Sequence, residues 1–131
     1  MVELPPLQRI TADQLTDATA QTSGMRRAAA ISEGTVGSTA IWMGRTVVEA
    51  GCSSGPHHHA HSETAIYVVS GRPVFRFKDG DEEVVLQTEP GDYVFVPPHV
   101  PHIEENPHNE DAVVVIARST QEALVENLDS L

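Results

Sequence analysis

The sequence predicts an all-β domain whose antiparallel strands form a sandwich or barrel. From Met25 onward, short runs rich in Val, Ile and aromatic residues alternate with Gly, Pro, Asp and Ser, as in folds built from many short strands. The segment Lys78-Asp79-Gly80-Asp81 is a hairpin-turn signal, because Asp-Gly accommodates the positive φ of a tight turn. Closely spaced strands joined by tight turns therefore favour an antiparallel arrangement.

The first part of the chain has a different composition, and we expect residues 1–24 to form an N-terminal arm on a single domain of residues 25–131. Pro5-Pro6 favours extended backbone. Thr11 and Gln14 have the spacing of a capping box, which predicts a short helix over Thr11–Thr22 that depends on docking for its stability.

The strands of the domain follow in order, each ended by a turn residue. We expect them at Arg26–Ile31, Thr39–Met43, Arg45–Glu49, Thr64–Ser70, Pro73–Lys78, Glu83–Gln87, Tyr93–Val96, His102–Glu104 and Val113–Arg118. Within the fifth, alternation puts Phe75 and Phe77 on one face and Arg76 on the other. For Gln121–Leu131, periodicity does not decide between a helix and an extended arm.

One run, Val113–Ile116, is apolar on both faces. Such a strand either lies centrally between layers or presents one face to another subunit. We predict a homodimer, whose packed edges would also be protected from open-ended strand pairing.

Composition excludes several classes of partner. The 131 residues include 8 Lys+Arg and 19 Asp+Glu, giving a formal net charge of −11, which argues against nucleic acid and against anionic membrane surfaces. No apolar run approaches the roughly 20 residues of a membrane span, and the N-terminus does not resemble a signal sequence. The single cysteine, Cys52, fits a reducing compartment, so we predict a cytoplasmic location.

A histidine cluster marks the candidate site. Four of the seven histidines fall within His57–His61, Glu63 follows, and His102 lies beyond a Pro-rich segment. In an extended chain the two histidines of His57-x-His59 point the same way, so both imidazoles can face one metal ion. Imidazole and carboxylate ligands suit divalent Fe, Mn, Ni, Cu or Zn. Taken alone, however, such a cluster is most often a solvated loop.

Two spaced groups of residues contain these histidines. In the first, five residues lie between Gly51 and His57-His58-His59, and Glu63 and Gly71 follow. The second is Gly91-Asp92-Tyr93-Val94-Phe95-Val96-Pro97-Pro98-His99-Val100-Pro101-His102-Ile103-Glu104-Glu105-Asn106. The two groups resemble the two sequence motifs of the cupin superfamily, specifically of its small RmlC-like members, with His99 where the family has glycine. We interpret His99 as an exposed turn residue.

The resemblance implies a jelly-roll barrel with a metal near its centre, held by His57, His59, Glu63 and His102. Counting back six residues from Gly71 reaches Thr64, however, and not Glu63. Either a one-residue bulge turns Glu63 inward, or three histidines hold the metal, or His61 is the fourth ligand.

The same resemblance implies an enzyme that acts on a small organic molecule, with an oxygenase-type reaction ahead of an isomerase or lyase. Glu63 and Tyr67 are the candidate catalytic proton carriers, and Glu104 and Glu105 are alternatives. The aromatic residues favour an apolar ligand over a sugar phosphate, since Arg76 lies opposite Phe75. The competing hypothesis is a small-molecule-binding or sensor cupin without turnover.

Overall fold

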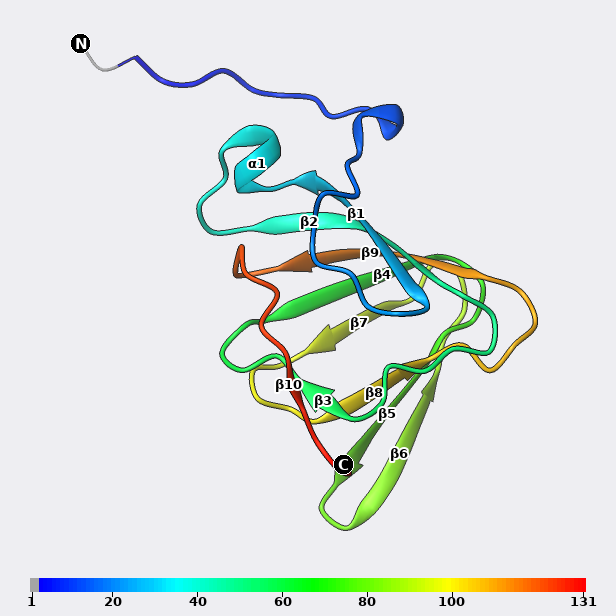
Figure 1. Ribbon diagram of the computed structural model, residues 1–131. Coiled ribbons are helices and arrows are strands. Elements are labelled where there is room, and N and C mark those ends of the chain that lie inside the picture. The colour runs from blue at the N-terminus through cyan, green and yellow to red at the C-terminus, as the bar shows by residue number, and fades with distance from the viewer. Residues whose placement is uncertain (1–2) are drawn as a thin grey trace.

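The computed structural model describes residues 3–131 and contains two five-stranded antiparallel sheets that pack as a jelly-roll (Figure 1). Sheet A has the order β1-β2-β9-β4-β7, and sheet B has the order β10-β3-β8-β5-β6. The predicted all-β class is confirmed. The strands are β1 Met25–Ile31, β2 Trp42–Val48, β3 His57–His58, β4 Thr64–Ser70, β5 Val74–Asp79, β6 Glu82–Gln87, β7 Tyr93–Val96, β8 His102–Glu105, β9 Ala112–Arg118 and β10 Glu126–Asn127.

The two sheets share one interior, and the alternation of side chains along each strand decides what enters it. In β2, β4 and β9 every second residue is buried, so Val114 and Ile116 point inward while Val113 and Val115 point outward. Most of the inward apolar residues form one hydrophobic cluster, made of Ala29, Trp42, Ile66, Val68, Phe75, Val96, Val114 and Ile116, and Met25, Val48 and Ala112 form a second. These clusters fill only part of the space between the sheets.

The strand β2 runs unbroken through Gly44, although two strands separated by this glycine were expected. Gly44 does not break the strand but allows close packing. A Cβ at position 44 would meet the carbonyl oxygen of Ala28 and lie 2.6 Å from Cη2 of Trp42. Gly44 therefore lets β1 and the Trp42 ring approach the same point of β2.

The N-terminal arm differs from the predicted helix over Thr11–Thr22. The capping box of Thr11 and Gln14 forms, but it starts only one 3₁₀ turn, η1 (Ala12–Gln14). Thr16 then pairs with Ala29 and Thr22 with Met25 as isolated β-bridges. Because Thr has low helix propensity and these residues find partners on β1, tertiary pairing prevails over the local helix signal.

Three elements lie outside the predicted strands: the short helix α1 (Glu33–Val36), β3 and β10. Within residues 3–131, no helix is long and apolar enough to cross a membrane. The C-terminal segment, defined here as residues 119–131, is extended. It crosses the open end of the sheets and pairs with β3 through β10, as the red ribbon of Figure 1 shows.

We predict that Gly44→Ala lowers the free energy of unfolding by about 2 kcal/mol, because backbone and the Trp42 ring occupy the place of the new methyl group. Urea denaturation followed by circular dichroism measures this change. Gly34→Ala is the control, since its nearest contact is Ser32 Oγ at 4.0 Å, and we expect its stability to be unchanged or raised by up to about 1 kcal/mol. Equal stabilities for the two variants would contradict the close-packing role of Gly44.

Candidate metal centre

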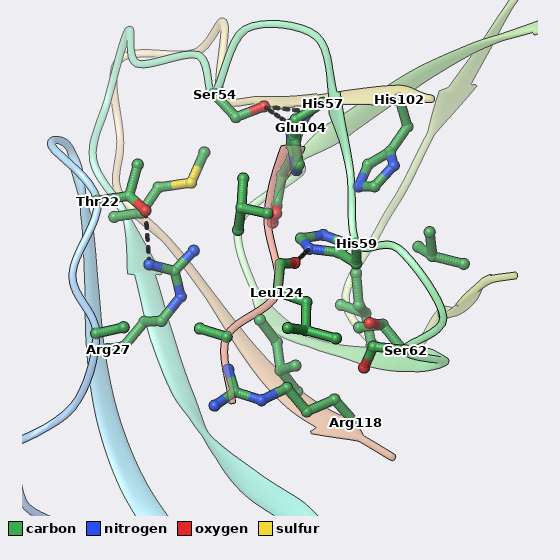
Figure 2. Close-up of a pocket in the computed structure, with 18 of the residues that line it drawn as sticks. Thr22, Arg27, Ser54, His57, His59, Ser62, His102, Glu104, Arg118 and Leu124 are labelled. Atoms are coloured by element: carbon green, nitrogen blue, oxygen red, sulfur yellow. Dashed lines mark hydrogen bonds between the residues drawn. The ribbon is translucent and has the colours of Figure 1, made fainter. Parts of the chain in front are cut away.

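Three histidines meet at one end of the space between the sheets. His57 lies in β3, His59 follows that strand directly, and His102 begins β8. One ring nitrogen from each lies within 4.8 Å of the others. Figure 2 shows the three imidazoles turned toward one another. The predicted grouping of His57, His59 and His102 is therefore present, and the three ring nitrogens could hold a metal ion.

Strand pairing and alternation bring these rings together. His57 pairs directly with His102 across β3 and β8, and their ring centroids are 4.4 Å apart. His58 faces away, as its alternate position predicts. Its Nε2 lies 3.0 Å from a carboxylate oxygen of Glu126, and its Nδ1 accepts a hydrogen bond from the Ala60 backbone N–H.

The hydrogen bonds of the three histidines select one tautomer. Nδ1 of His57 donates to the Gly55 carbonyl at 3.0 Å, that of His59 to Leu124 at 2.9 Å and that of His102 to Val100 at 2.9 Å. A carbonyl oxygen only accepts, so each Nδ1 carries the proton and each Nε2 keeps a free lone pair. Backbone carbonyls that orient ligand imidazoles in this way are typical of metal sites.

Burial keeps these imidazoles neutral. Desolvation lowers the pKa of His59 and of His102 to about 4, and it also lowers the pKa of His57. Nearby positive charge acts in the same direction, since Arg27 lowers the pKa of both His57 and His59. At neutral pH the three side chains are therefore ready to bind a cation without first losing a proton. The donor set fits a divalent transition metal.

A buried carboxyl group lies beside the histidines. Glu104 is two residues after His102 on β8, so both side chains point into the interior, and Glu104 pairs with Phe75 of β5. Its Oε1 has no hydrogen-bond partner among the described residues. Desolvation raises the pKa of Glu104 to about 7, although Arg27 acts in the opposite direction.

The histidines and Glu104 line a cavity of about 240 Å³ between the sheets. Sheet A contributes two arginines to its wall, Arg27 from β1 and Arg118 from β9, together with apolar side chains such as Trp42 and Ile66. The Arg118 guanidinium lies over the Trp42 ring, 4.1 Å from its centroid. The C-terminal segment closes the cavity with Leu124 and its neighbours (Figure 2).

The structure does not bring Glu63, His61 or Tyr67 into this group. Glu63 and His61 are exposed, while Ser62 and Thr64 are buried and line the cavity. The bulge that would turn Glu63 inward is absent at this end of β4, whose register with β9 shifts between Val68 and Ser70. Of the alternatives left open by the sequence, the observed geometry matches the three-histidine centre.

Tyr67 lies on the other side of β4 from Thr64 and Ile66, because alternate residues of a strand point to opposite faces. Its ring packs edge-on against Tyr93, which is 81% exposed, on the outer face of sheet A. His99 is exposed at a positive φ of 64°, as interpreted from the sequence.

Two features of the site were missed. Arg27 was not among the candidates, although Met25, Arg27 and Ala29 alternate along β1 and the two apolar residues are buried. That alternation is a usable signal for an inward arginine. The cavity wall formed by the C-terminal segment has no such signal, because it depends on pairing with β3.

Comparison with known families agrees with this geometry. The model of the family described as Cupin domain matches residues 44–118, more than half of the chain. This stretch contains all three histidines and both sequence motifs. No curated protein sequence matches the chain.

Solved structures share the fold at low sequence identity. Peruvianin-I, described as a cysteine peptidase from Thevetia peruviana latex, has a TM-score of 0.72 at 14% identity, covering 92% of this chain and 77% of that chain. An oxalate oxidase in complex with glycolate has a TM-score of 0.68 at 15% identity, and the match covers 86% of this chain and 59% of the oxidase chain. The S161A mutant of Bacillus subtilis oxalate decarboxylase has a TM-score of 0.70 at 20% identity, and the match covers 84% of this chain and 29% of the decarboxylase chain. The chain thus spans about three fifths of the oxidase and less than a third of the decarboxylase.

We predict that Glu104→Gln stabilises the metal-free protein more at pH 8 than at pH 4. The folded-state pKa of Glu104, about 7, lies above its ordinary value of 4.5. The unfolded chain therefore loses this proton first, and wild-type stability declines as the pH rises from 4.5 to 7. A pKa shift of this size corresponds to a loss of about 3 kcal/mol of unfolding free energy in the wild type. The Glu104→Gln variant, whose amide stays neutral, does not lose this stability.

Urea denaturation of chelator-treated protein at several pH values measures this difference. Glu82→Gln, exposed on β6, controls for the loss of one carboxylate. A constant stability difference between Glu104→Gln and wild type across this pH range would contradict the burial of an ionisable Glu104.

Proposed function

The chain belongs to the cupin domain family, and from that premise we propose that it is a metal-dependent enzyme acting on a small organic molecule. An oxygenase-type reaction is favoured over an isomerase or lyase reaction. The observation that carries the proposal is a set of three neutral imidazoles whose free Nε2 atoms lie at a cavity between the sheets. A purely structural metal site has no need of an adjoining cavity.

In this proposal His57, His59 and His102 hold a divalent Fe, Mn, Ni, Cu or Zn ion. Such an ion, when bound, polarises substrate oxygen atoms and, if redox-active, supplies electron transfer. Three protein ligands leave coordination positions for the substrate. Thr64, at the place where the family motif has Glu, carries a hydroxyl group and no carboxylate.

The protein's own groups bind and orient the substrate. The carbonyls of Gly55, Leu124 and Val100 fix the ring orientations of the ligands, so the site is formed before substrate arrives. Glu104 takes the role first assigned to Glu63 and Tyr67, because among the described residues it is the carboxyl group that faces the cavity. The Glu104 carboxyl, whose Oε1 is buried and unpartnered, borders the cavity and is the group that we propose to exchange a proton with a bound molecule.

The cellular setting and oligomeric state are part of the proposal. The single cysteine, Cys52, is free, which fits the predicted cytoplasmic location. The outer face of sheet A, defined here by Met43, Ala65, Tyr67, Tyr93, Phe95 and Val115, is apolar apart from the neighbouring Arg45 and carries the exposed rings of Tyr93 and Phe95. An apolar sheet face of this kind supports the predicted homodimer.

The metal assignment predicts that His59→Ala loses bound metal. Wild-type protein purified without added metal or chelator is expected to contain a divalent metal in near-stoichiometric amount, and the variant about tenfold less. Elemental analysis by mass spectrometry measures both. His61→Ala and Glu63→Gln are matched controls and should retain the metal, since both side chains are exposed. Undiminished metal in His59→Ala would defeat the assignment.

The same preparations test for turnover. Substrate-dependent oxygen consumption in a screen of small organic acids and phenols should be present in wild type and absent from His59→Ala. Saturable ligand binding without turnover would instead favour a binding or sensor cupin, the alternative from another functional class.

The dimer prediction has its own test. Light scattering at micromolar concentration should give twice the mass of the 14.2 kDa chain, and Phe95→Glu should give the monomer mass, because a charge in an apolar interface is costly. Val85→Glu, on the outer face of sheet B, is the control and should remain dimeric. A monomeric wild type would refute the prediction.

A further inference from the structure

Two guanidinium groups face the cavity from the sheet opposite the histidines. Arg27 shares the inward face of β1 with the buried Met25 and Ala29, and Arg118 shares that of β9 with Val114 and Ile116. Both lie close enough to the metal centre to lower the pKa of His59. Figure 2 shows both side chains on the cavity wall.

Neither arginine has a carboxylate partner among residues 3–131. The ion pairs of the described chain use Arg26, Arg76 and His58, but not these two. Glu104, the single acidic residue among the described cavity-lining side chains, lies beyond ion-pair distance of both. The cavity therefore carries two positive charges against at most one negative charge, inside a protein of net charge −11.

The hydrogen bonds of the two arginines leave particular donors free. Arg27 Nη1 donates to Thr22 Oγ1 at 2.8 Å, while its Nε and Nη2 have no acceptor among the described residues. Arg118 Nε and Nη2 donate to the carbonyls of Thr120 and Gln121, which leaves Nη1. The Nε and Nη2 edge of a guanidinium matches the two oxygens of one carboxylate.

Burying such charges without a carboxylate partner is costly. Desolvation lowers the pKa of Arg27 and brings that of Arg118 to about 10, so both remain protonated at neutral pH but are poorly solvated. A bound anion would offset this cost. Arg118 has an additional structural role, since it stacks on Trp42 and holds the C-terminal segment. Among the described residues, Arg27 makes a single side-chain hydrogen bond, to Thr22 of the N-terminal arm.

We propose that the cavity binds a small organic acid, whose carboxylate lies against the free edge of Arg27 and beside Arg118 while the rest of the molecule points toward the three histidines. This inference deepens the proposed function and rests on it for the orientation of the ligand. The volume of about 240 Å³ is below the roughly 300–1,000 Å³ of sites for drug-sized ligands. A carboxylate suits the few free donors better than a phosphate, which requires more of them.

The proposed ligand differs from the apolar ligand that the sequence favoured. Of the aromatic residues that indicated an apolar ligand, Phe95 is 60% exposed outside the cavity. Arg76, the arginine on which that sequence argument depended, pairs with Glu105 outside the interior. The inward arginines are on sheet A instead.

The test measures binding of malonate by isothermal titration calorimetry, with malonamide as its uncharged counterpart and inorganic phosphate as the competing anion. Each titration uses both chelator-treated and zinc-loaded protein. Trp42, the only tryptophan, lines the cavity beside Arg118, so its fluorescence locates the binding site. We expect malonate to bind and to change this fluorescence, and malonamide to bind at least tenfold more weakly.

Arg27→Gln is expected to weaken malonate binding by about tenfold to a hundredfold, the loss typical of hydrogen bonds to a charged group. Arg26→Gln is the matched control. It removes the same charge from the neighbouring position of β1, where the side chain is exposed and pairs with Glu49. The affinity of this variant for malonate should stay within twofold of that of the wild type. Arg27→Lys keeps the charge without the two-donor edge, so it should bind weakly even if Arg27→Gln does not fold.

Equal malonate affinity in wild type, Arg27→Gln and Arg27→Lys would overturn the inference, as would tighter binding of phosphate than of malonate. The proposed function has a separate outcome. Arg27-dependent binding in chelator-treated protein, together with unchanged metal content in His59→Ala, would preserve the anion site and defeat the metal enzyme. Loss of metal in His59→Ala, together with no malonate binding by the wild type, would preserve the metal centre and defeat the anion site.

Discussion

The structure depends on the alternation of side chains in two sheets that share one interior. Each strand sends every second residue into the same space, so a given inner face must supply both the hydrophobic core and the site. On β9 the inward series runs from Val114 and Ile116 in the core to Arg118 at the cavity. On β8 it is polar throughout, with His102 followed by Glu104. The site is therefore a continuation of the core in which polar residues replace apolar ones.

Polar groups in such an interior need partners, and the way they find them determines the chemistry. The Nδ1 atoms of the three histidines are bonded to backbone carbonyls, which leaves their Nε2 atoms as the free groups. In contrast, Oε1 of Glu104 and one edge of Arg27 have no partner among the described side chains and backbone groups. These free groups all belong to residues that line one cavity, where a metal ion would bind the Nε2 atoms and an anionic ligand would bind the Arg27 edge.

Much of this arrangement follows from local sequence. The bounds of β4 and β7 agree with the prediction, the spacing of His57-x-His59 brought those two histidines together and excluded His58, and the resemblance to the cupin motifs added His102. The predictions made from spacing share a cause, since residues that alternate along one strand have a fixed relation that sequence displays. The inward position of Arg27 follows the same rule and was open to prediction.

Other features required knowledge of which segments meet. Gly44 suggests a strand break until β1 is placed against it, and Thr11–Thr22 suggests a helix until Thr16 and Thr22 find partners. Glu63 looks like a ligand because of its spacing from the histidines. Its side chain nevertheless points outward, because β4 begins at Thr64 with that residue facing the interior. In each case a contact between distant segments prevails over the local preference.

The C-terminal segment shows how far this dependence extends. It has no hydrophobic periodicity of its own, yet the Leu124 carbonyl orients His59, and Glu126 holds His58 on the outer side of β3. The carbonyls of Thr120 and Gln121 bind Arg118 on the opposite side of the cavity. One irregular segment therefore contacts a histidine of the three-histidine cluster and an arginine of sheet A. Since the ring orientation of His59 and the guanidinium position of Arg118 both depend on its backbone, the two ends of the cavity keep their relative geometry only while this segment stays paired with β3.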